Sequence, residues 1–142
     1  MNFENTILAL FYARQDEPIQ GKNRLMLYLF LTSELILKEN HFKHTSYYYG
    51  PWHNEYAKAI NELKNSGFIL ASLVGHSTNF ILSTKGLDSV RNKILKKHIT
   101  LELLNDINSL IRKYDDISVR SIVSDIRCNY EPFFYKTVYD HT

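Results

Sequence analysis

The fold is decided by residues 50–83, which read GPWHNEYAKAINELKNSGFILASLVGHSTNFILS. Gly50 and Pro51 interrupt the chain, and Pro51 suits the first turn of a helix because its missing N–H costs nothing there. We therefore expect a helix from about Trp52 to Ser66 that stops at Gly67. The strand-like runs FILASL and NFILS follow, and the turn-forming VGHST between them predicts a β-hairpin.

The helix expected over 52–66 has two contrasting faces. Side chains turn by about 100° per residue, which gathers apolar residues on one face and polar residues on the other. The apolar face carries Tyr56, Ala57, Ile60 and Leu63. The polar face carries Asn54, Lys58, Asn61 and Asn65. We expect the helix to pack through the first face and to present the second.

Apolar residues at helical spacing predict further helices on both sides of this segment. Phe3–Arg14 is expected to be a short amphipathic helix, and Lys22–Glu39 is apolar enough to be a central helix buried on most sides. The run QDEPIQG at 15–21 is expected only to separate them. Three more helices are expected after the hairpin, each with an apolar stripe. The first is capped by Thr84 and carries Leu87, Val90, Ile94 and Leu95. The second is capped by Thr100 and carries Leu101, Leu104, Ile107 and Ile111, and the third begins at Ser118 and carries Val119, Ile122, Val123 and Ile126.

Composition is that of an ordinary single domain. The chain has 142 residues, 44% of them apolar, and a net charge of only +2. We expect one domain over 1–142, with its core at about 3–97 and a C-terminal helical extension at about 100–139. The single cysteine, Cys128, is expected to be a buried, inert thiol. No signal peptide and no apolar run near the roughly 20 residues that cross a bilayer are found, which favours a cytoplasmic protein without a membrane partner.

Three stretches, PIQGKNRLMLYLFLTSEL at 18–35, YYYGPWHNEYAKAINELKNSGFI at 47–69 and FILSTKGLDSV at 80–90, carry a series of motifs. These are a Gly-Lys-X-Arg-Leu opening, a Tyr-Gly-Pro-aromatic turn, a Leu-X-X-X-Gly-hydrophobic helix end and a strand end, here Leu-Ser-Thr-Lys-Gly. Their order resembles a YwgA-like family of small archaeal and phage-associated winged-helix proteins. The MarR and PadR regulators and the SocA-like Panacea antitoxins are more distant relatives. The resemblance implies a mainly α fold with a small β-hairpin: a winged helix-turn-helix with additional C-terminal helices.

The resemblance also implies a transcriptional regulator, archaeal or viral, that binds double-stranded DNA. Winged helices place the helix after the turn in the major groove and lay the hairpin along the backbone. Asparagine can pair with adenine, and lysine can donate to guanine or to phosphate. The residues expected to contact DNA are Lys43, His44, Tyr48, His53, Asn54, Lys58, Asn61, Lys64, Asn65 and His76. Of these, Asn54, Lys58 and Asn61 are expected to read bases, and Lys43, His53 and Lys64 to hold phosphates.

The charge distribution allows a plainer interpretation, in which the polar helix face is merely solvated. The hairpin tip contains no Lys or Arg, and Glu55 and Glu62 lie on one flank of the expected reading helix. Through Gly75 the chain has seven Lys plus Arg and seven Asp plus Glu, and beyond it ten and eight. Since phosphate contacts supply most of the affinity of DNA-binding proteins, binding by one subunit should be modest.

A homodimer would double that charge, and the helices after Thr100 are the expected interface. An aromatic group is expected either to join this interface or to fold back onto Leu8, Phe11 and Tyr12 of the same chain. It comprises Tyr130, Phe133, Phe134, Tyr135 and Tyr139. The alternative function is a winged helix that binds only proteins, as an antitoxin or an assembly subunit. A third hypothesis is a small-molecule sensor.

Signatures of catalysis and of cofactors are not found in the sequence. It contains no phosphate-binding glycine loop, nucleophile elbow or paired catalytic carboxylates. His41, His44 and His53 lack further ligands at a spacing that suits a metal. Asp115 and Asp116 are expected to form a turn at a helix end. We therefore expect no enzyme activity, no metal and no cofactor.

Overall fold

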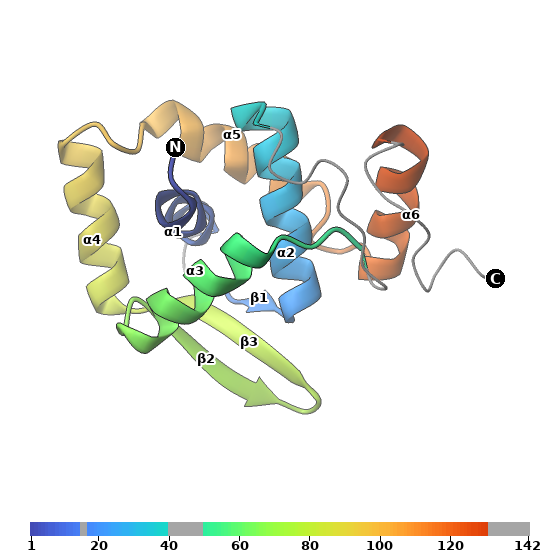
Figure 1. The fold of residues 1–142 in the computed structure, drawn as a ribbon, viewed down its shortest axis with the longest axis horizontal. Helices are drawn as coiled ribbons and strands as arrows, with labels where there is room; N and C mark the ends of the chain where they lie inside the picture. Colours follow the sequence, from blue (N-terminus) through green and yellow to red (C-terminus); the bar gives the residue numbers. More distant parts are fainter. Residues whose placement is uncertain (15–16, 40–49, 131–142) are drawn as a thin grey trace.

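The computed structural model describes residues 1–14, 17–39 and 50–130, and shows a mainly helical chain with a small antiparallel sheet (Figure 1). The elements in order are α1 (Phe3–Ala13), β1 (Ile19–Gln20), α2 (Lys22–Leu31), the π-helical turn η1 (Thr32–Leu37), α3 (Asn54–Asn65), β2 (Ile69–Val74), β3 (Ser77–Leu82), α4 (Thr84–Leu95), α5 (Leu101–Arg112) and α6 (Val119–Tyr130). Several residues singled out above lie outside the described ranges: His41, Lys43, His44, Tyr48, Phe133, Phe134, Tyr135 and Tyr139.

Helix α1 lies at the centre of the molecule, which the sequence did not indicate. Figure 1 shows it end-on, between α4 on one side and α2 on the other. Seven consecutive residues, Asn5 to Phe11, are buried, so over this stretch the helix is covered on every side instead of having a solvent face. The predicted helix is confirmed, but the expectation that it is amphipathic is wrong. Helix α2 is the second buried element, as expected, since Leu25 to Leu31 are all buried.

The sheet has three strands in the order β1-β3-β2, with both pairs antiparallel. The hairpin expected after α3 is confirmed, with Val74 opposite Ser77 across a turn at Gly75 and His76. Strand β1 was not expected, because it lies in the run predicted only to separate two helices. Ile19 pairs with Phe80 and Gln20 with Asn79. Two residues are too few to show the alternation of buried and exposed side chains that marks a strand, so β1 is recognised only by its pairing with β3.

Helix boundaries follow the predicted caps with two corrections. Helix α3 begins at Asn54 with His53 as its N-cap, so Pro51 lies before the helix and not in its first turn. The Thr100 hydroxyl accepts the N–H of Leu103 at 3.1 Å and caps α5, as expected. Helix α4 is capped by Ser83 and not by Thr84, since the Ser83 hydroxyl accepts the N–H of Gly86 at 3.0 Å. The same hydroxyl donates to the Gly67 carbonyl at 2.5 Å and lies 3.1 Å from the Phe68 carbonyl oxygen, and so joins the helix start to the chain just before β2.

The C-terminal helices belong to the same hydrophobic core as the elements before them. Helix α5 packs on α1, and α6 on α2. Ile107 and Ile111 of α5 and Ile122, Val123 and Ile126 of α6 are all buried in one cluster with α1, α2 and α3.

Three predicted burials are wrong. Leu95 is 81% exposed and Leu101 is 65% exposed, because they lie at the facing ends of α4 and α5, where no described element covers them. Cys128 is exposed, because it is off the buried stripe of α6 that Ile122 and Ile126 define.

Candidate nucleic-acid interface

Helix α3 is anchored through its apolar face, as the sequence predicted. Tyr56, Ile60 and Leu63 are buried, and Ala59 joins them in place of Ala57, which is half-buried. Burial raises the pKa of the Tyr56 phenol, whose neighbours are Ser33 and Thr6. The opposite face of the helix is thereby fixed toward solvent.

His53 caps the start of α3. Its Nδ1 accepts the N–H of Tyr56 at 3.4 Å, and its ring lies 5.3 Å from the ring of Phe3 and 5.5 Å from that of Tyr56. Trp52 packs against the core beside it and donates from Nε1 to the amide oxygen of Asn54 at 3.2 Å. The ring expected to hold phosphate therefore has a structural role at this helix terminus.

The polar face of α3 is exposed along its length. The exposed residues of this helix that were expected to contact DNA are Asn54, Lys58, Asn61, Lys64 and Asn65. They do not share one electrostatic environment, because the two flanks of α3 carry opposite charge.

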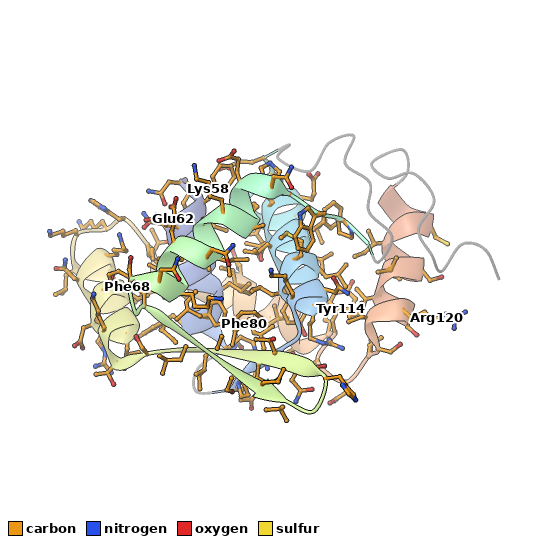
Figure 2. All side chains as sticks on the ribbon, turned by 60° about the horizontal axis from the view of Figure 1, so that its bottom comes forward. Lys58, Glu62, Phe68, Phe80, Tyr114 and Arg120 are labelled. Carbon is orange, nitrogen blue, oxygen red and sulfur yellow. The ribbon has the colours of Figure 1, made fainter. Side chains whose placement is uncertain are left out.

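One flank of α3 is acidic. Lys58 lines a shallow cavity there with Glu4 of α1 and with Glu55 and Glu62 of its own helix. Figure 2 shows Lys58 and Glu62 on the side of α3 that faces away from the hairpin. Three carboxylates around one ammonium group make this flank unfavourable for a phosphate.

The other flank borders a basic groove, with a volume of about 470 Å³, between α3, the hairpin turn and the first turns of α2 and α6. Its charged and titratable lining residues are Lys22, Arg24, Lys64 and His76. Asn23, Asn61, Ser77 and Thr78 add side chains that can donate hydrogen bonds. No Asp or Glu is among the described residues that line it.

The backbone adds to the positive potential of the basic groove. Gly21, at the N-cap of α2, has φ +89° and no side chain to accept the first-turn amides, which leaves the positive end of the helix dipole facing the groove. The Gly21 N–H itself donates to the Thr78 carbonyl of β3 at 2.8 Å. Strand β1 and the hairpin thus hold the start of α2 against the groove.

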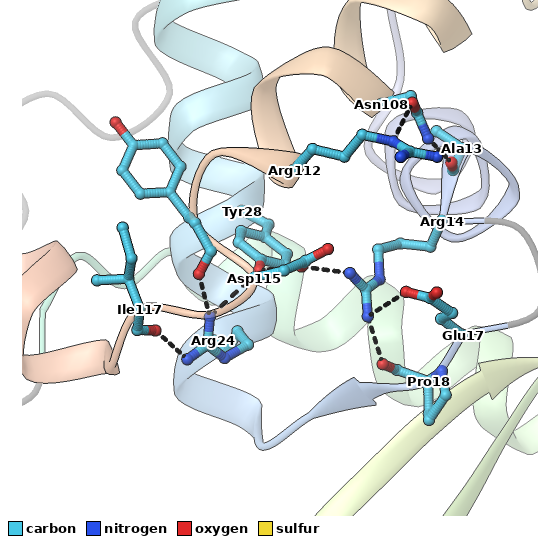
Figure 3. Close-up of polar contacts among 11 residues, drawn as sticks. Ala13, Arg14, Glu17, Pro18, Arg24, Tyr28, Asn108, Arg112, Asp115 and Ile117 are labelled. Carbon is cyan, nitrogen blue, oxygen red and sulfur yellow. Dashed lines mark hydrogen bonds and ion pairs between the residues drawn. The ribbon is translucent and has the colours of Figure 1, made fainter.

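Arg24 is held in place by neutral groups (Figure 3). Its guanidinium donates to the Tyr114 carbonyl at 3.0 Å, to the Ile117 carbonyl at 2.6 Å and to the Tyr28 hydroxyl at 3.2 Å. None of these three acceptors is charged, so none of them is a counter-ion for the guanidinium at the rim of the groove.

A polar network behind Arg24 joins the α5–α6 connection to the first two helices (Figure 3). Asp115 accepts from the Tyr28 hydroxyl at 2.7 Å and also from the guanidinium of Arg14, which in turn donates to the Pro18 carbonyl at 2.8 Å. Burial, and secondly the hydrogen bond to Asp115, raise the pKa of Tyr28 to about 12. Asp115 was expected only to end a helix, and no local signal indicates its partners.

The structure thus brings Asn61, Lys64 and His76 together and adds Lys22 and Arg24, which the sequence reasoning missed. Those two residues belong to the Gly-Lys-X-Arg-Leu motif at 21–25, so a signal was present. No metal-binding group of three or more His, Cys, Asp or Glu side chains occurs in the part of the chain that is described. Within that same part, no helix has the length and apolarity needed to span a membrane.

Comparison with protein-family models, curated proteins and solved structures found no match.

Proposed function

We propose that this protein is a winged-helix DNA-binding protein, a transcriptional regulator that holds duplex DNA along α3 and the basic groove. The order α1-β1-α2-α3-β2-β3, with β1 and β2 on either side of β3, supports this assignment. The observation that carries the proposal is the basic groove, where Lys22, Arg24 and Lys64 meet without a lining carboxylate beside exposed Asn61.

The chemistry of the groove matches a phosphate backbone. Lys22 and Lys64 supply ammonium groups from two different helices, and the Lys22 ammonium lies 5.9 Å from the centre of the Trp52 ring. The first turn of α2 adds its free amides at the same groove. Asn61 and Asn65 lie on the exposed surface of α3, where an amide can pair with adenine. In this arrangement the phosphate contacts come from the groove side of α3, and Lys58 on the acidic flank contributes less to DNA affinity.

The first prediction concerns Lys22→Ala and Lys64→Ala. Each should weaken binding to duplex DNA and reduce the slope of log K against log salt by about 0.9, the value for one lost phosphate contact. Fluorescence anisotropy with duplex from upstream of the protein's own gene, at several salt concentrations, measures both quantities.

Lys58→Ala is the matched control, because it removes the same charge from the same helix but from the acidic flank. It should leave the salt slope nearly unchanged. Wild-type binding that does not depend on salt, or equal effects of the Lys58 and Lys64 substitutions, would contradict the assignment of the groove.

A protein-binding module, such as an antitoxin or an assembly subunit, is the second candidate function. It is favoured by the exposed side chains of Leu95 and Leu101 where α4 passes to α5, near a cleft of about 530 Å³ between these helices, α1 and β3. Stoichiometric co-purification of one protein, together with no salt-sensitive retention on duplex DNA, would select this function over the first.

A further inference from the structure

Strand β2 is an open edge of the sheet. It pairs with β3 on one side, and no other described strand pairs with it. The hairpin extends beyond the helices in Figure 1. A strand in this position presents a row of main-chain donors and acceptors to any strand that can approach it.

The register shows which groups face outward. Ser83 N–H donates to the Phe68 carbonyl at 3.0 Å, so these two residues form a hydrogen-bonded pair at the start of the hairpin. Such pairs alternate along an antiparallel ladder. Leu70 and Ser72 therefore direct their N–H and C=O groups toward β3, while Ala71 and Leu73 direct theirs away from the sheet.

The edge lacks the features that usually protect one. No Asp, Glu, Lys or Arg occurs between Gly67 and Thr84. Leu70 is 54% exposed, Leu73 76% and Val74 57%, which leaves large apolar side chains in water. Natural edge strands are commonly guarded by lysines, prolines or bulges, and an unguarded one is suited to pairing.

We propose that β2 pairs antiparallel with β2 of a second copy of this chain, about a two-fold axis through Ser72, and so joins two sheets into one. In this register Ala71 lies opposite the partner's Leu73, and both exchange main-chain hydrogen bonds. Leu70 lies opposite the partner's Val74 on the other face. Each exposed apolar side chain thereby gains a neighbour across the two strands.

A second copy fits this edge because the strand is self-complementary. A two-fold axis normal to the sheet places residues of the same face opposite each other, which requires a pattern symmetric about one residue. Leu70 and Val74 are related in this way on one face, and Ala71 and Leu73 on the other. Because the strand is uncharged, two copies meet without repulsion. The inference does not depend on DNA binding.

The test is the mass of the purified protein by sedimentation equilibrium, from micromolar to submillimolar concentration. The wild type should be a dimer, and Leu73→Lys should raise its dissociation constant at least about tenfold, since two ammonium groups enter the pairing. Leu95→Lys is the matched control, because it places the same charge on an exposed leucine of α4 and should leave the dimer intact.

A mixing experiment tests the register without relying on loss of assembly. A chain with Ala71→Glu and Leu73→Glu, and one with Ala71→Lys and Leu73→Lys, should each be monomeric and should form a one-to-one dimer when mixed. Circular dichroism of each chain checks that it is folded. A monomeric wild type, an unchanged dimer in Leu73→Lys, or no association on mixing folded chains would overturn the proposal.

Discussion

The side chain of Asp115 links three segments of the chain by hydrogen bonds. It accepts hydrogen bonds from Tyr28 on α2 and from Arg14 after α1, and it lies in the connection between α5 and α6. Arg24 is attached to the same tyrosine and reaches the basic groove. The position of the cation thus depends on a carboxylate far away in the sequence.

Tyr28→Phe tests this network and its dependence on pH. Loss of the hydrogen bond to Asp115 should lower the free energy of unfolding by about 1–2 kcal/mol at neutral pH, with Arg14 still bound to the carboxylate. Urea denaturation followed by circular dichroism measures the difference.

The raised pKa of Tyr28 determines how the stability of the protein changes with pH. Because the folded pKa of Tyr28 is about 12 against an ordinary value of 10.0, its stabilising contribution is complete below pH 10.0 and is lost as the pH rises to about 12. Phenylalanine does not ionise, so the stability difference between the two proteins should shrink over that range. A constant difference would contradict the assigned pKa.

Among the elements, α4 and the sheet meet at a glycine. A Cβ on Gly86 would lie 2.2 Å from the Phe68 carbonyl oxygen and 2.6 Å from Cδ1 of Leu82. Gly86 ends the Leu-Ser-Thr-Lys-Gly motif seen in the sequence. The close approach of the Phe68 carbonyl oxygen, which requires a glycine there, is seen only in the structure. The burial of α1 also could not be read from its sequence, because the pattern within one helix does not tell how many other elements pack around it.

Gly86→Ala should therefore destabilise the protein by about 2 kcal/mol, although alanine has the higher helix propensity. The Phe68 oxygen belongs to the backbone and cannot turn aside as a flexible side chain can. Thermal denaturation compares it with Asn92→Ala, an exposed substitution in the same helix that should change the stability little.

At the scale of the whole molecule, the C-terminal helices share the core of the N-terminal elements. The Asn108 amide on α5 donates to the Ala13 carbonyl of α1 at 2.7 Å, and Ile107 is fully buried. A core shared in this way should unfold as one cooperative unit.

Ile107→Ala tests that cooperativity. It should cost about 2–5 kcal/mol and lower the unfolding midpoint equally by far-ultraviolet circular dichroism and by fluorescence of Trp52, the single tryptophan, which lies at the start of α3. Asp106→Ala, at an exposed neighbouring position, is the control. Two separate transitions would show that α5 and the elements around α3 unfold independently.

Local periodicity was sufficient to predict most helices, the hairpin and the exposed polar face of α3, because each depends on residues a few positions apart. The short strand β1, the burial of α1 on all sides and the partners of Asp115 were decided only by the tertiary structure, since each depends on segments distant in the chain. The same holds for the site. The sequence predicted Asn61, Lys64 and His76 as contact residues, but only folding places Lys22 and Arg24 beside them and sets Lys58 among carboxylates. Electrostatic potential depends on distance in space, and the chain order does not contain those distances.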